Sequence, residues 1–318
     1  MTRRPLILTS LIILAVVMLL SACTPQASIT PAPSPTEPAS ESLELTDGLG
    51  RVVTLPTPAQ RIVSLAPSNT EILFALGAGA QVVGRDEFSD YPAEAASLPS
   101  VGGGFGDYSS EAIVALEPEL VLAAEINPPE LVQSLEELGL VVYLLPNPNS
   151  LDELYTNLET VARLTDRKDN ASALITALKA RVAAVEEKIA ATQARPKVFY
   201  ELDGSEPNAP WTAGPDTFID TLIQVAGGQN VASGLEGQYA QLSVEALLVQ
   251  APEIILLGDA AYGVTPESVA ARPGWEAMPA VQNGQLYVFD DNLVSRPSPR
   301  LVDGLEQLAR LIHPEIFK

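Results

Sequence analysis

The chain has 318 residues, a length typical of about two domains, and carries 18 Lys and Arg against 40 Asp and Glu, for a formal net charge of −22. A surface that binds a phosphate backbone needs clustered basic residues, so this charge excludes nucleic acid as a partner. The single Cys cannot form an internal disulfide or a paired-cysteine zinc site, and the single His, His313, excludes a multi-histidine metal site. A Ser-His-Asp triad would depend on that one residue, so the composition disfavours ordinary hydrolytic catalysis.

Residues 1–22 have the pattern of a secretory signal peptide. Two arginines near the start are followed by an almost unbroken apolar run from residue 6 to residue 20. That run is too short for a comfortable transmembrane helix. The sequence Leu-Ser-Ala-Cys at residues 20–23 resembles the bacterial lipobox, which implies cleavage before Cys23 and lipidation of its thiol. The alternative is an ordinary signal peptide followed by an incidental Cys.

Residues 23–42 are rich in Pro, Ser and Thr. A stretch of this composition cannot bury an apolar core and favours extended, solvated chain. We therefore expect a tether that joins a lipid anchor to a globular body. The predicted location is extracytoplasmic, with the protein held by its lipid at the outer face of the cytoplasmic membrane.

Short apolar strands alternate with apolar helices in the next part of the chain. The expected strands cover residues 61–65, 82–84, 120–123 and 141–145, and the expected helices cover residues 72–76, 110–116 and 131–138. Such alternation indicates βαβ units and a mostly parallel sheet. The four residues from Ser68 to Glu71 fit a capping box at the start of the first helix, which assigns Glu71 to helix capping.

One segment, residues 170–195, differs from the rest because apolar residues recur in it at spacings of three and four without a Pro or Gly. A helix of that length would measure roughly 39 Å, about the diameter of a domain. A coiled-coil seam is the alternative, but the repeat is short for one. The position favours a connecting helix, residues 167–195, between an N-terminal α/β lobe at 43–166 and a C-terminal α/β lobe at 196–318.

The second half repeats a pattern of the first. The sequence EALLVQAPEIILL from Glu245 matches EAIVALEPELVLA from Glu111, and both read as an acid, a short apolar helix, a Pro, an acid and a buried strand. Duplicated lobes would place the two glutamates at equivalent points. The predicted fold is α/β, with two similar lobes of mostly parallel sheets flanked by helices, one long helix joining them, and a ligand cleft between them.

Three motifs together resemble the substrate-binding proteins of ABC importers. They are RIVSLAPSNTEILFALG at residues 61–77, Asp-Tyr-Pro at 90–92, and the Glu111 repeat, and the sequence Arg-Pro-Ser-Pro-Arg at 296–300 fits the same family. The resemblance covers about residues 44–318. It is strongest to the class with one rigid helix between its lobes, which serves vitamin B12, ferric siderophores and haem, and within that class to the vitamin B12-binding members.

The resemblance implies a set of cleft residues that hold the ligand between the lobes. In the vitamin B12-binding members the ligand contacts a few aromatic side chains, a polar or acidic residue (here Asp291 or Asn292) and an arginine. Carried over by motif, the ligand-binding positions are Phe88, Phe105, Trp211, Tyr239, Asn292 and Arg296. Two of these are Phe where that family has Tyr or Trp. Large flat rings bury a bulky macrocycle with little loss of rotamer entropy, although packing in the core and a surface ion pair are the alternative roles for the aromatics and the arginine.

Glu111 and Glu245 carry a second implication of the resemblance, since matching glutamates of that family dock onto arginines of the membrane permease. Two equivalent acids suit a two-fold transporter dimer. Acids in the first turn of a helix are also favoured by the helix dipole, which is the alternative explanation. The implied partners are an ABC permease dimer with its ATPase subunits, a small-molecule ligand and the membrane through the N-terminal lipid, with the protein itself a monomer.

The predicted function is capture of cobalamin or a related corrinoid outside the cell and its delivery to the permease, with no enzymatic activity, no cofactor and no protein-bound metal. A ferric-siderophore or haem-binding protein of the same class is the alternative. An enzyme on the same scaffold and a lipoprotein adhesin are more distant ones. The glycine-rich residues 102–106 lack the spacing of a phosphate-binding loop and are expected to present Phe105 to the cleft.

Overall fold

The computed structural model describes residues 42–104 and 107–317. The expected signal peptide, Cys23, almost all of the tether and Phe105 lie outside these ranges. Within them, no helix is both long enough and apolar enough to span a membrane.

We call the segment from β1 to α5 the first lobe. Its strands are β1 Leu43–Thr46, β2 Val52–Leu55, β3 Ile62–Ser64, β4 Val82–Arg85, β5 Leu120–Ala124 and β6 Val142–Leu145. Its helices are α2 Pro67–Ala75, α3 Ser110–Ala115, α4 Pro129–Glu137 and α5 Leu151–Thr165, with short 3₁₀ turns η1 Gly79–Gln81 and η2 Ala95–Ser97. Strands β1 and β2 form an antiparallel hairpin, and the other four make a parallel sheet in the order β4-β3-β5-β6.

The second lobe runs from β7 to α12 and is joined to the first by α6. Its strands are β7 Lys197–Asp203, β8 Trp211–Ala213, β9 Gln229–Asn230, β10 Tyr239–Gln241, β11 Ile254–Leu257 and β12 Leu286–Val288. Its helices are α7 Phe218–Val225, α8 Val244–Gln250, α9 Pro266–Ala270, α10 Pro279–Gln282, α11 Asn292–Ser295 and α12 Leu301–Ile312, with the 3₁₀ turn η3 Gly258–Tyr262. The six-stranded sheet has the order β10-β8-β7-β11-β12 with β9 beside β7, and β8 and β10 form an antiparallel edge that the sequence patterns did not indicate.

Both sheets are buried on their two faces, as the predicted βαβ architecture requires. In β5, Leu120 and Leu122 belong to one apolar cluster while Val121 and Ala123 belong to another. Strand β11 divides in the same way between two clusters. The continuous apolar runs that identified these strands in the sequence therefore reflect side chains packed on alternate faces, and the α/β prediction is confirmed.

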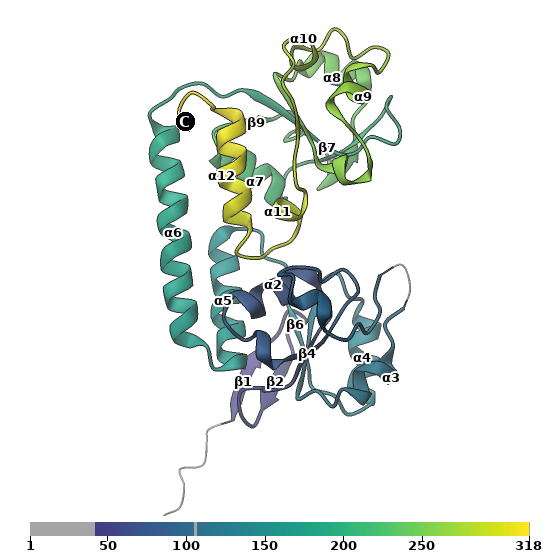
Figure 1. The fold of residues 1–318 in the computed structure, drawn as a ribbon, viewed down its shortest axis with the longest axis vertical. Coiled ribbons are helices and arrows are strands. Elements are labelled where there is room, and N and C mark those ends of the chain that lie inside the picture. The colour runs from purple at the N-terminus through teal and green to yellow at the C-terminus, as the bar shows by residue number, and fades with distance from the viewer. Residues whose placement is uncertain (1–41, 105–106, 318) are drawn as a thin grey trace, which may run out of the picture. The chain divides into compact units, whose positions relative to one another are not determined.

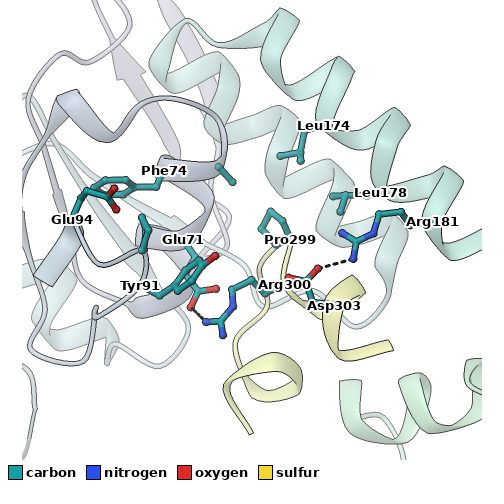
Figure 2. Close-up of a pocket in the computed structure, with 12 residues that line it drawn as sticks. Glu71, Phe74, Tyr91, Glu94, Leu174, Leu178, Arg181, Pro299, Arg300 and Asp303 are labelled. Atoms are coloured by element: carbon teal, nitrogen blue, oxygen red, sulfur yellow. Dashed lines mark hydrogen bonds and ion pairs between the residues drawn. The ribbon is translucent and has the colours of Figure 1, made fainter. Parts of the chain in front are cut away.

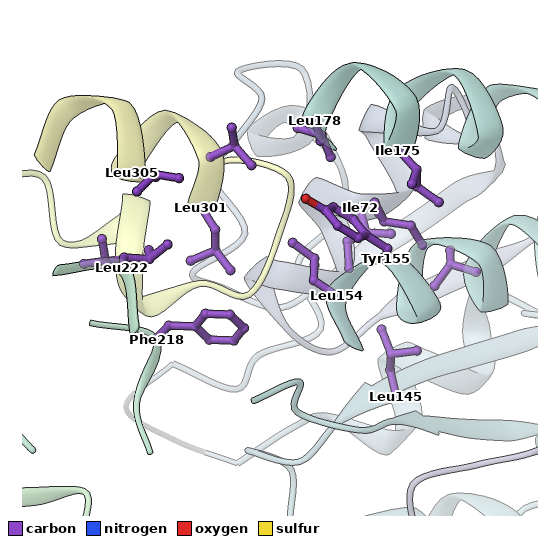
Figure 3. Packing of buried hydrophobic residues seen from close by; sticks show 14 of the residues in the cluster. Ile72, Leu145, Leu154, Tyr155, Ile175, Leu178, Phe218, Leu222, Leu301 and Leu305 are labelled. Carbon is purple, nitrogen blue, oxygen red and sulfur yellow. The ribbon is translucent and has the colours of Figure 1, made fainter. Parts of the chain in front are cut away.

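The predicted connecting helix is present as α6, Lys168–Ala190 (Figure 1). It ends at Ala190, five residues before the predicted end at Arg195. Its buried stripe is Ala171, Ile175, Leu178, Val182, Val185 and Ile189. These side chains share one cluster with residues of α2, α5, α7 and α12, so a single apolar core packs along α6 against both lobes (Figure 3).

The capping role predicted for Glu71 is wrong. Helix α2 begins earlier, at Pro67, with Ala66 as an N-cap that makes no side-chain hydrogen bond. Proline suits the first helical position because its fixed φ matches a helix and its missing N–H needs no partner there. Glu71 consequently lies in the second turn of α2, where it is 3% exposed. A carboxylate buried to this degree needs partners, and they come from the other lobe.

Candidate functional site

The carboxyl ends of the parallel strands β3, β5 and β6 of the first lobe open onto a cavity of about 550 Å³, a size within the usual range for small-molecule sites. The first lobe lines it with the segments that follow β3, β5 and β6, and with Asn157 of α5. The second lobe contributes Gln238, Tyr239, Ser295, Arg296 and Pro297. We call this cavity the cleft. Two of the predicted ligand-binding residues, Tyr239 and Arg296, therefore lie in its wall.

A third predicted residue, Trp211, lies beside Tyr239 on the antiparallel edge of the second sheet. The register pairs Tyr239 with Ala213 and Gln241 with Trp211, so the two aromatic side chains occupy one face at diagonal positions. Trp211 is 42% exposed and Tyr239 is 57% exposed. Two large rings held on one exposed sheet face form a platform on which a flat ligand can stack, and we call this pair the aromatic ledge.

The hydroxyl of Tyr239 is held in its neutral form. Partial burial raises the pKa of this phenol, and the negative charge of Asp291 raises it further. Asp291 itself accepts a hydrogen bond from the hydroxyl of Tyr200 at 2.8 Å. A neutral phenol can donate a hydrogen bond to a ligand in the cleft or accept one from it.

Glu71 is the centre of an ion-pair network that ties the lobes together. Its carboxylate accepts hydrogen bonds from Arg296 at 3.2 Å, from Ser298 at 2.5 Å and from Arg300 at 3.1 Å. Arg296 also donates to Asp90 of the first lobe at 2.7 Å. The donors all belong to the short segment before α12, whereas both acceptors belong to the first lobe. We call these five residues the interlobe latch.

Arg300 has further contacts besides Glu71. Its guanidinium lies 4.0 Å from the ring centroid of Tyr91 (Figure 2). It also makes an ion pair with Asp290 at 3.4 Å. A cavity of about 600 Å³ lies next to this arginine, between α2 and the apolar residues Leu174 and Leu178 of α6. The aromatic ledge does not contribute to it, so this second hollow is separate from the cleft.

Arg296 links the latch to the cleft because it lines the cavity and pairs with two carboxylates. Burial acts to lower the pKa of its guanidinium, but the hydrogen bond and charge of Asp90, followed by those of Glu71, outweigh burial and raise that pKa. Its positive charge is thus already compensated within the protein. The same holds for Arg300, which pairs with Glu71 and Asp290.

The cleft lining does not include the other predicted residues that the structure describes, among them Trp211. Phe88 follows β4 and is partly exposed, and Asn292 begins α11 and donates its side-chain amide to Asp290 at 3.0 Å. Glu111 and Glu245 are exposed in the first turns of α3 and α8. Phe105 lies outside the described residues.

Sequence reasoning missed the latch acids and one apolar cleft residue, Ile126. This side chain follows β5, lines the cleft and is 80% exposed. Its position directly after a buried strand, where α/β proteins bind ligands, was the available signal. For Glu71 the available signal was a charged residue directly before the apolar run Ile-Leu-Phe-Ala of α2. Across the described residues, no group of three or more His, Cys, Asp or Glu could hold a metal ion.

Comparisons with known proteins agree with this architecture. A family model described as periplasmic binding protein matches residues 62–293. An uncharacterised ABC transporter substrate-binding lipoprotein of Bacillus subtilis, YvrC, is 32% identical over 86% of this chain and 86% of its own length. The crystal structure of the periplasmic vitamin B12-binding protein of Vibrio cholerae is 30% identical, with a TM-score of 0.69, over 81% of this chain and 98% of that one. A periplasmic haem-binding protein of Pseudomonas aeruginosa is also 30% identical, with a TM-score of 0.71, over 81% and 94% of the two chains.

Proposed function

We propose that the ligand of this chain, which belongs to the periplasmic binding protein family, is cobalamin or a related corrinoid. The chain is an extracytoplasmic substrate-binding protein of an ABC transporter, in the class that serves vitamin B12, haem and ferric siderophores. Members of this family are binding proteins and not enzymes. Overall sequence identity does not discriminate between the ligands, since the vitamin B12-binding protein of Vibrio cholerae and the haem-binding protein of Pseudomonas aeruginosa are both 30% identical to this chain. The ligand is therefore inferred from the chemistry of the cleft.

The observation that carries the proposal is the charge pairing of Arg296, which lines the cleft, and of Arg300, its neighbour in the interlobe latch. Arg296 and Arg300 both donate to Glu71, and each has a second carboxylate partner. Binding the propionates of haem or the anionic groups of a ferric siderophore would require these cations to leave their partners. A corrinoid presents amide groups at its periphery, which can hydrogen-bond to a charge-compensated wall without such a cost.

Iron coordination is a second point against haem. The side chains of His, Met, Cys and Tyr are the usual protein ligands of haem iron. Among the described residues that line the cleft, Tyr239 alone belongs to this set. The aromatic ledge offers a stacking surface to a macrocycle of either kind, so the shortage of iron ligands is what disfavours haem.

Calorimetric titration of the purified protein tests the ligand. We expect cyanocobalamin and cobinamide to bind with a Kd at least about 100-fold lower than that of haemin or of a ferric hydroxamate siderophore, a difference of about 2.7 kcal/mol in binding free energy. Tighter binding of haemin or the siderophore than of either corrinoid would refute the corrinoid assignment while leaving the transporter class intact.

The proposal includes the anchor and the docking contact. Lipidation of Cys23 is supported by its lipobox-like context and by the lipoprotein relative. Docking of Glu111 and Glu245 onto the permease is supported by their exposure at equivalent positions of the two lobes. The double variant E111Q/E245Q is expected to reduce corrinoid uptake by whole cells severalfold or more while leaving the calorimetric Kd unchanged. A weakened Kd in that variant would contradict the docking role.

A further inference from the structure

Helices α3 and α8 repeat one local structure in the two lobes. Each begins after a serine whose side-chain oxygen accepts a hydrogen bond from a backbone N–H three residues later: Ser109 from Ala112 at 3.1 Å, and Ser243 from Ala246 at 3.3 Å. Each is followed by a non-glycine residue of positive φ just before a proline, and these are Glu117 with φ 45° and Ala251 with φ 52°. The backbone therefore presents corresponding side chains in the same way.

One exposed aliphatic side chain follows each docking glutamate by one turn. Val114 is 41% exposed and Leu248 is 37% exposed, whereas the residues just before them, Ile113 and Leu247, are completely buried. Residues three apart on a helix are neighbours on its surface. Each lobe therefore shows a carboxylate with an apolar side chain beside it, anchored by a core residue between them.

A single exposed aliphatic residue needs no explanation on a protein surface. Here the same type of residue recurs at the same position of both repeats, next to the same acid and on the same local backbone. An exposed ion pair by itself contributes little to binding, because water and salt screen it. An apolar contact alongside would exclude water from the pair and strengthen it.

We infer that Val114 and Leu248 are part of the surface that binds the permease, and that each half of the permease dimer offers a basic side chain beside an apolar hollow. The inference rests on the proposed function and extends it from two charges to two mixed charged and apolar contacts. Two equivalent contacts fit a partner with two-fold symmetry.

The test uses the full-length protein with its cognate permease–ATPase assembly in lipid nanodiscs, and measures the protein concentration that half-maximally stimulates ATP hydrolysis. V114T and L248N keep the side-chain size while making it polar. We expect each to raise that concentration severalfold and the double variant to raise it about tenfold, with the Kd for cyanocobalamin unchanged. V52T is the matched control, because Val52 is 66% exposed but lies on β2, outside both repeats.

Several outcomes would overturn the inference. If V114T/L248N stimulated ATP hydrolysis at the same half-maximal concentration as the unmodified protein while E111Q/E245Q needed a higher one, only the two glutamates would contribute to docking. An effect confined to one lobe, or an equal effect of V52T, would contradict a duplicated apolar contact. Failure of the unmodified protein to stimulate the assembly at all would instead refute the proposed docking function, so the two failures are distinguishable.

Discussion

Replacing Glu71 with alanine is expected to lower the free energy of unfolding by about 3 kcal/mol, the cost of removing one partner from a buried ionic network. The side chains of Arg296 and Arg300 are each 15% exposed and both donate to this carboxylate. Without the Glu71 carboxylate, the two largely buried arginines would have only Asp90 and Asp290, both partially exposed, as carboxylate partners. Urea denaturation followed by circular dichroism measures the change.

Two controls compare the buried acid of the latch, Glu71, with its exposed acid, Asp90. D90A removes a carboxylate whose side chain is 65% exposed, so its cost should stay within about 1 kcal/mol. A double-mutant cycle of E71A with R300A should give a coupling energy above about 1 kcal/mol, because the two groups are in direct contact. If E71A cost no more than D90A, Glu71 would not be the centre of the interlobe contact.

The latch also shows where sequence reasoning reaches its limit. The capping box is a local pattern of four residues, and it assigned Glu71 to the helix that contains it. The actual donors, Arg296 and Arg300, are 225 and 229 residues further along the chain. No local pattern encodes a contact of that separation, although both halves of it lay in motifs that carried the family resemblance.

Features that depend on local periodicity were predictable. The stripe along α6 and the apolar strands β5 and β11 follow from spacings of three to four residues and from short buried runs. Strands β8 and β10 were not predictable in this way, since each has three residues, β8 between Pro210 and Gly214 and β10 shortly after Gly237. The pairing of these strands places Trp211 and Tyr239 on the same face of the sheet. The family resemblance therefore identified the two residues, but only the strand register shows that they form the aromatic ledge.

Replacing either ring of the aromatic ledge with alanine is expected to weaken corrinoid binding by roughly 30- to 150-fold, or about 2 to 3 kcal/mol, the usual range for an aromatic residue at the centre of a binding site. Trp211 and Tyr239 are large rings left exposed by the fold, so their burial becomes available only when a ligand covers them. Calorimetric titration of W211A and Y239A with cyanocobalamin measures the loss. Thermal melts should show little change, because neither ring is part of an apolar cluster.

The conservative variant Y239F separates stacking from coordination. It keeps the ring and removes the hydroxyl, so a corrinoid stacked on the ledge should lose no more than about threefold in affinity. If the ligand were instead haem bound through a tyrosine oxygen, Y239F would be as damaging as Y239A, because the metal ligand would be gone. The ratio of the Kd of Y239A to that of Y239F therefore tests whether the ring acts by stacking. The same ratio discriminates a corrinoid from a haem bound through the tyrosine oxygen.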